Sequence, residues 1–99
     1  IQVNTGYEKQ KSGIMPNEIS QFYEYCSQKL KLPITGLMCI PPINEEPSTH
    51  FCYLHELSRK LNLKNLSMGM SSDYEIAIKF GATYLRLGTI FFGERQNQI

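Results

Sequence analysis

The chain has 99 residues and a net charge of +1, with charges of both signs scattered along it. This length suits one small domain or part of a larger one, and the lack of a basic stripe argues against nucleic acid as a main partner. No apolar run approaches the roughly 20 residues that span a bilayer, so we expect no membrane partner. Because the chain begins with Ile1 and already resembles a strand there, we expect a fragment of a longer protein.

The first predicted elements are the end of a strand and a helix. Gln2–Asn4 reads as the strand end, and a polar loop follows it to Met15. Pro16 suits the first turn of a helix. We predict a helix over Asn17–Lys31, because apolar residues recur there at helical spacing. The predicted apolar stripe consists of Ile19, Phe22, Tyr23, Cys26 and Leu30.

A buried strand and a second helix come next. Ile34–Ile40 is apolar without strict alternation, as in a parallel strand covered on both faces. Pro41 and Pro42 end it, and Ser48 or Thr49 can cap the helix that follows. The predicted inner face of this helix consists of Phe51, Leu54, Leu57 and Leu61.

The third strand–helix pair spans Asn65–Met68 and the residues after it. Ser72 and Glu75 have the spacing of a capping box, and Asp73 adds negative charge to the first turn. Gly81 is well placed to terminate the helix. The predicted buried side consists of Ile76, Ala77 and Phe80.

The last predicted strand is Thr83–Leu87, and Thr89–Phe92 can begin a final helical turn. Strands and helices therefore alternate, which indicates an α/β fold built from parallel strand–helix–strand units. Four strands of this kind form half of a (β/α)₈ barrel or a small open sheet.

Two short runs are candidates for binding an anion, because each follows a strand where a helix would start. The first run consists of Ser67, Met68, Gly69, Met70 and Ser71. The second begins fifteen residues after Ser71 and consists of Arg86, Leu87, Gly88 and Thr89. Alternatively, the first run is only a capped helix with a tight turn, and Arg86 only pairs with a neighbouring carboxylate. Together the runs resemble the phosphate site after the last two strands of a (β/α)₈ barrel.

Other polar residues fit binding less well. Asn4 points toward the same edge, where it bonds a ligand or caps the loop. Lys11, beside Ser12 and Gly13, can reach an anionic group, whereas Lys9 reads as a solvated lysine.

A metal site is not expected. His50, Cys52 and His55 do not share one helical face, so zinc is disfavoured. The three cysteines, Cys26, Cys39 and Cys52, match no disulfide framework, and we expect them to be reduced and packed in a cytoplasmic protein. No nucleophile elbow or Walker A pattern occurs, and we predict no catalytic residue.

The segment LSMGMSSDYEIAIKFGATYLRLGTIFFGER resembles the C-terminal signature of the YggS/PROSC family of pyridoxal phosphate homeostasis proteins. VNTGYEKQKSGI resembles the Asn-containing strand and Lys-Ser-Gly loop of that family, and GLMCIPP resembles its Gly-Leu-Met strand. The resemblance implies residues 1–99 to be the C-terminal part of a single barrel, similar to the N-terminal domain of alanine racemases and other fold-type III pyridoxal phosphate proteins. The lysine that forms the Schiff base lies in the absent N-terminal half.

The resemblance also implies residue roles. Ser71, with the backbone of Gly69 and Met70, matches the family's phosphate loop, and Gly88 and Thr89 match the next one. Arg86 matches an arginine facing the cofactor, Asn4 lines the opposite side, and Lys11 is at most a secondary amine.

Two functions are implied. The first is a non-catalytic protein of intracellular pyridoxal phosphate homeostasis, monomeric at full length, which hands the cofactor to pyridoxal-phosphate-dependent apoenzymes. The second is the barrel domain of an amino-acid racemase or decarboxylase. Those enzymes carry a second, β-rich domain after the barrel. Because this chain shows no such domain, we expect the carrier.

Overall fold

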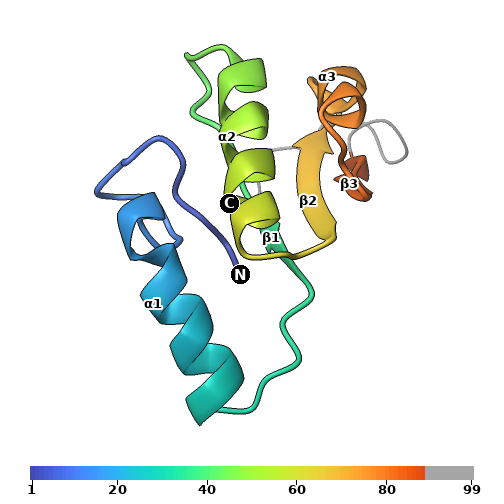
Figure 1. The fold of residues 1–99 in the computed structure, drawn as a ribbon. Helices are drawn as coiled ribbons and strands as arrows, with labels where there is room; N and C mark the ends of the chain where they lie inside the picture. Colours follow the sequence, from blue (N-terminus) through green and yellow to red (C-terminus); the bar gives the residue numbers. More distant parts are fainter. Residues whose placement is uncertain (89–99) are drawn as a thin grey trace.

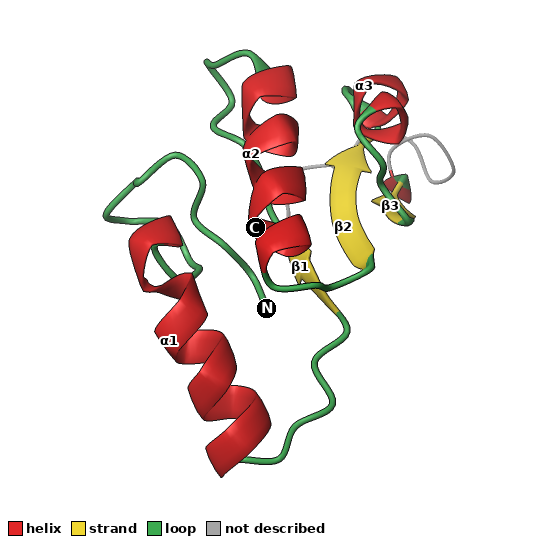
Figure 2. Ribbon diagram, in the orientation of Figure 1, coloured by secondary structure: helices red, strands yellow, loops and turns green. Residues whose placement is uncertain are grey.

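The computed structural model describes residues 1–88, which form a small parallel sheet with helices packed on it (Figures 1 and 2). Thr89, and with it the helical turn predicted at Thr89–Phe92, lies outside the described residues. No helix within residues 1–88 is both long and apolar enough to cross a membrane.

The sheet contains β1 (Gly36–Met38), β2 (Asn65–Met70) and β3 (Tyr84–Arg86), which lie side by side in that order and run parallel. Gln2 pairs in parallel with Met38 at the free edge of β1, so the predicted first strand is reduced to isolated bridges. The predicted α/β class with parallel strands is therefore confirmed.

The first helical segment is continuous but irregular. A 3₁₀ turn at Pro16–Glu18 leads into α1 (Ile19–Glu24), and a π-helical turn at Tyr25–Lys29 ends it. The predicted apolar stripe is only partly buried. Ile19 and Cys26 are buried, whereas Phe22 and Leu30 are exposed. The helical segment extends away from the sheet toward its Lys29 end (Figure 1), so only part of the stripe is covered.

The helix α2 (Pro47–Lys60) begins earlier than predicted, and neither Ser48 nor Thr49 caps it. Glu46 is the N-cap, and its carboxylate accepts a hydrogen bond from the Ser48 backbone N–H at 3.4 Å. Pro47 occupies the first helical position, where its missing N–H costs nothing.

The helix α3 (Tyr74–Lys79) also departs from the predicted start. Asp73 is its N-cap, and Ser72 and Glu75 form no capping box. The Asp73 carboxylate accepts from the Met70 backbone N–H at 2.8 Å, so it holds the turn before the helix rather than the helix itself. Gly81, with a φ of +96°, follows the helix end as predicted.

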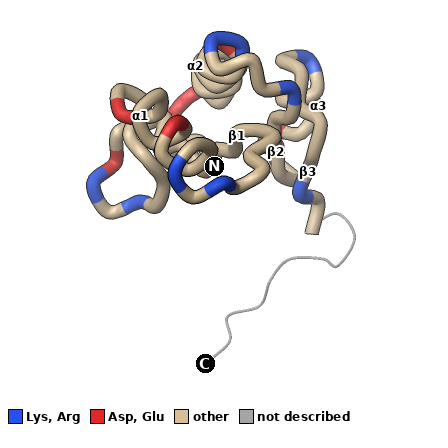
Figure 3. The backbone as a smooth tube through the Cα atoms, turned by 60° about the horizontal axis from the view of Figure 1, so that its bottom comes forward, with Lys and Arg blue, Asp and Glu red and all other residues tan. Residues whose placement is uncertain are grey.

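Charged residues are interspersed over the described chain, without a continuous basic stripe (Figure 3). The helices carry Glu18 and Glu75 in first turns and Lys29, Arg59 and Lys79 in last turns. This arrangement complements the helix dipoles.

The core lies between the sheet and the inner faces of α2 and α3. Its largest fully buried side chains are Phe51, Leu37, Leu54, Met68, Val3 and Cys39. Of the predicted inner face of α2, Phe51, Leu54 and Leu57 are buried and Leu61 packs partly against them. On α3, Ala77 is fully buried, and Ile76 and Phe80 are partly buried. The buried faces of α2 and α3 could be predicted from the sequence, because the spacing of apolar residues along a helix is a local feature.

Candidate functional site

A cleft of about 690 Å³ opens at the carboxyl ends of β1 and β2. One wall is formed by residues 40–47, which follow β1, and another by residues 70–73, which follow β2. Lys11 contributes from a third segment, the N-terminal loop that precedes Ile14. Ligands of parallel α/β folds gather at this edge, because loops from neighbouring strands meet there.

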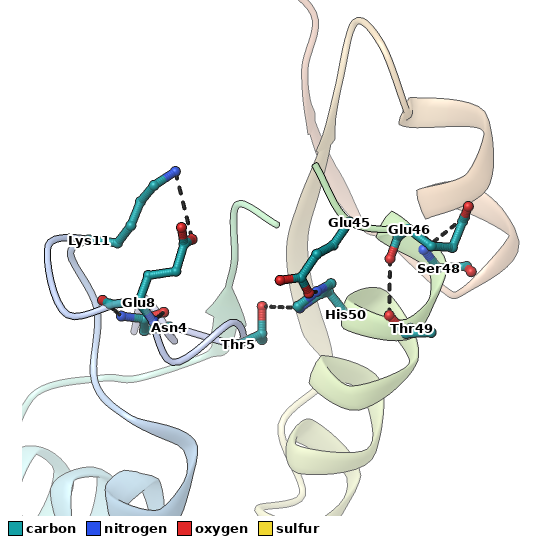
Figure 4. Close-up of polar contacts among 9 residues, drawn as sticks. All are labelled: Asn4, Thr5, Glu8, Lys11, Glu45, Glu46, Ser48, Thr49 and His50. Atoms are coloured by element: carbon teal, nitrogen blue, oxygen red, sulfur yellow. Dashed lines mark hydrogen bonds and ion pairs between the residues drawn. The ribbon is translucent and has the colours of Figure 1, made fainter. Parts of the chain in front are cut away.

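The loop that carries Lys11 is held by its own side chains (Figure 4). Asn4 is buried, and its Nδ2 donates to the Glu8 carbonyl at 2.6 Å while its Oδ1 accepts from the Glu8 N–H at 3.0 Å. Of the two predicted roles for Asn4, the structure therefore shows the loop cap. Lys11 Nζ lies 3.9 Å from Glu8 Oε1, so its amine is only loosely paired at the cleft.

A second contact ties the same loop to α2. Tyr7 Oη lies 3.2 Å from Tyr53 Oη, and Tyr7 has a φ of +55°. The hydrogen bond with Tyr7, together with partial burial, raises the pKa of Tyr53 to about 12.

The first predicted anion run is divided between core and cleft. Met68 is 0% exposed and belongs to the core, whereas Met70 is 42% exposed and lines the cleft together with Ser71. Ser67 pairs with Met38 and Tyr84 within the sheet and lines a separate small hollow. The Met70 N–H, predicted as an anion donor, already donates to Asp73. The cleft therefore receives only the end of the run.

Gly69 is required by packing. Its φ is +103°, and a Cβ built there would lie 2.7 Å from Ala77 Cβ and 2.9 Å from Leu85 Cδ2. The space beside this glycine is therefore filled by α3 and β3. A side chain would separate β2 from α3.

Arg86, the last residue of β3, spans the end of the sheet. Its Nη2 donates to the Cys39 carbonyl at 3.1 Å, and its Nε is buried with no hydrogen-bond partner among the described residues. Within residues 1–88 no carboxylate forms an ion pair with it, so the alternative of a structural ion pair finds no support. Leu87 is half-buried and Gly88 is open, since no atom of the described residues lies within 4 Å of a Cβ built there.

The buried thiol and the histidines form no metal site. Among residues 1–88 no group of three metal-ligating side chains is found, and all three cysteines are free. Cys26 and Cys39 are buried as predicted, but Cys52 is exposed because it lies on the outer face of α2. Burial raises the pKa of the Cys39 thiol to about 12, which makes it a neutral packing residue.

The cleft is also lined by residues that were not predicted to contact a ligand. They are Ile40, Pro41, Pro42, Ile43, Glu45, Pro47, Ser72 and Asp73. The one available signal was that Pro41 and Pro42 end a strand, since the loop after such a strand lies at the ligand-binding edge. No local signal joins this loop to Lys11 or Ser71.

The sequence of the chain is similar to those of known proteins. A family model described as the alanine racemase N-terminal domain matches residues 1–96. The chain belongs to this family. It is 42% identical to the pyridoxal phosphate homeostasis protein of Aquifex aeolicus over 97% of this chain and 46% of that one. It is 45% identical to the protein of the same name from Pseudomonas aeruginosa over 96% of this chain and 44% of that one.

Solved structures agree with the fold. PipY of Synechococcus elongatus without PLP superposes with a TM-score of 0.80 at 33% identity, covering 94% of this chain and 48% of PipY. PipY with PLP bound gives a TM-score of 0.73 at 32% identity, covering 94% and 47%. The chain thus spans about half the length of the relatives that it matches.

Proposed function

We propose that residues 1–99 are the C-terminal half of a barrel that binds pyridoxal phosphate and serves its homeostasis as a non-catalytic carrier. The observation that carries the proposal is Arg86, whose buried Nε has no hydrogen-bond partner within residues 1–88 and lies at the edge of the sheet where ligands gather. An unsatisfied buried donor is costly, and an anionic ligand relieves that cost. The names of the relatives and the PLP bound to PipY support pyridoxal phosphate as that ligand.

The described residues fit the phosphate end of the cofactor. Arg86 supplies a cation, Ser71 supplies a hydroxyl at the cleft, and Gly88 leaves its backbone open to a ligand. Thr89 would add a second hydroxyl from its position next to Gly88. When bound, pyridoxal phosphate supplies an aldehyde that reacts reversibly with primary amines, and Lys11 is the amine at this cleft.

The residues of this chain would then hold and shield the cofactor. Arg86 and Ser71 bind the anionic end by charge and hydrogen bonding. The prolines of the cleft wall, Pro41, Pro42 and Pro47, add a rigid apolar surface against which a ring can pack and exclude water.

A pyridoxal phosphate titration of the full-length protein, followed by absorbance, tests the proposal. Arg86→Ala and Thr89→Ala are measured beside the wild type, and Arg59→Ala, an exposed arginine at the far end of α2, is the matched control. We expect a cofactor band that weakens in the first two variants and not in the third. No band in the wild type, or clear racemisation of alanine, overturns the carrier.

We infer further that the recipients are pyridoxal-phosphate-dependent apoenzymes and that the full-length carrier is monomeric. Reactivation of an apoenzyme by loaded carrier, at a rate above that given by equal free cofactor, tests the first point. Sedimentation of the loaded protein tests the second.

A further inference from the structure

His50, in the first turn of α2, joins two segments that border the cleft (Figure 4). Its Nδ1 lies 2.9 Å from Thr5 Oγ1, and its Nε2 lies 2.8 Å from Glu45 Oε1. His50 and Thr5 are buried, whereas Glu45 is half exposed and lines the cleft. The ring therefore connects the wall after β1 with the segment that leads to Lys11.

The chemistry of the three groups fixes the direction of the hydrogen bonds. An ionised carboxylate only accepts, so His50 Nε2–H donates to Glu45. In the neutral ring Nδ1 then accepts from the Thr5 hydroxyl. Thr5 adjoins Asn4, whose side chain holds Glu8, and Glu8 in turn lies beside Lys11. A single chain of contacts thus runs from one wall of the cleft to the other.

The position of the two carboxylates that line the cleft affects how well it can bind an anion. Glu45 and Asp73 both line the space in which Lys11 and Ser71 lie. Each carboxylate has an internal donor, since Asp73 accepts from the Met70 N–H and Glu45 accepts from His50. Without its donor, the Glu45 carboxylate would be free to turn into the cleft, where it would repel a phosphate.

We propose that His50 is a positioning residue of the anion site. It holds the Glu45 carboxylate against α2, away from a bound phosphate, and it fixes the Thr5 segment that orients the Lys11 loop. This role rests on the proposed function, because it assumes that the cleft receives an anion.

The test is calorimetric titration of the full-length protein with pyridoxal phosphate and with inorganic phosphate. The variants are His50→Leu, His50→Gln and the double variant His50→Leu with Glu45→Gln. The control is Ser58→Ala, which removes another buried polar contact of α2, the 2.6 Å hydrogen bond to the Leu63 carbonyl, at the opposite end of the helix.

We expect His50→Leu to weaken binding of both anions by roughly 2- to 10-fold, the range of one net hydrogen bond. Removal of the Glu45 charge in the double variant restores most of that loss, and His50→Gln, which keeps a donor, stays within about 2-fold of wild type. Ser58→Ala leaves both affinities unchanged. A structural role alone predicts no recovery in the double variant, so wild-type binding by His50→Leu, or a loss that Glu45→Gln does not repair, overturns the assignment.

Failure of the proposed function is distinguishable from failure of this inference. If the wild type binds neither anion, the proposed function fails. The hydrogen-bonded chain from Glu45 to Glu8 is then tested in the ligand-free protein. Amide exchange at Glu8 and Glu45 should then accelerate in His50→Leu and not in Ser58→Ala. Unchanged exchange at both amides overturns the positioning role.

Discussion

The Arg86 guanidinium on β3 donates to the carbonyl of Cys39, which directly follows β1, so one side chain reaches across the end of β2. The contact joins residues 47 positions apart, and among the described residues the buried Nε has no hydrogen-bond partner. The Nη2 group of Arg86 thus has a structural role, whereas its Nε–H is the donor that we propose for a ligand.

Replacement of Arg86 by Met should distinguish its contribution to stability from its contribution to cofactor binding. The variant loses one hydrogen bond but also removes a buried unsatisfied N–H, so the two effects largely offset, and we expect the free energy of unfolding to change by less than about 1 kcal/mol. The affinity for pyridoxal phosphate should fall at least about 10-fold, because charge-assisted hydrogen bonds are the stronger kind. Urea unfolding and a cofactor titration check both. A large loss of stability with unchanged affinity would make Arg86 a purely structural residue.

Gly69 and Gly88 form a matched pair for the two predicted anion runs. Gly69→Ala introduces a Cβ at 2.7 Å from Ala77 Cβ in a backbone with a φ of +103°. We expect it to lower the free energy of unfolding by about 2–4 kcal/mol. Gly88→Ala meets no atom of residues 1–88 within 4 Å and should leave stability nearly unchanged. Thermal unfolding of both variants decides the matter, and equal midpoints would contradict the tight packing of β2 on α3.

Met68 and Met70 should respond in opposite ways to truncation. Met68 is fully buried, so Met68→Ala should cost about 2–5 kcal/mol of folding free energy through lost burial and a cavity. Met70 is exposed at the cleft, and Met70→Ala should change stability by no more than about 0.5 kcal/mol. Chemical denaturation of the two variants provides the measurement. A Met68→Ala protein as stable as wild type would mean that its side chain faces the cleft.

The buried Cys39 thiol predicts a loss of stability in alkali. The pKa is about 12 in the folded protein against an ordinary value of 9.0, mainly because of burial. The unfolded chain therefore releases this proton first, so the stabilisation is complete below pH 9 and declines as the pH rises from 9 toward 12. Denaturant midpoints at pH 8, 9 and 10 should fall in wild type and fall less in Cys39→Ala. Tyr53→Phe is the control, because the raised pKa of Tyr53 acts only at higher pH.

The same burial predicts thiol reactivity. In the native protein one thiol, that of Cys52, should react rapidly with a thiol reagent, and Cys26 and Cys39 only after unfolding. Mass spectrometry of the labelled peptides identifies the modified cysteine. Rapid native labelling of Cys39 would show that the Thr5 segment opens readily.

Local patterns in the sequence determined the order of the elements and most of the core. The inner faces of α2 and α3 follow from helical spacing, and the end of α3 at Gly81 follows from the freedom of glycine at positive φ. The helix starts were less predictable. Glu46 and Asp73 are the N-caps, although hydroxyl side chains lie next to both in the sequence, and residue types alone do not decide which residue takes that position.

The candidate site depended on tertiary structure. The residue types of an anion site were visible in Ser71 and Arg86, because the end of a parallel strand is a local feature. The long-range contacts were not visible, since His50 contacts Thr5 across 45 positions and Arg86 contacts Cys39 across 47. Ser71 lines the cleft, whereas Arg86 is not among its lining residues. Side-chain spacing along a helix or strand carries information over a few residues only. Local sequence patterns were therefore enough to predict the parallel α/β fold and the edge at which we propose that a ligand binds, whereas the folded chain shows which side chains meet there.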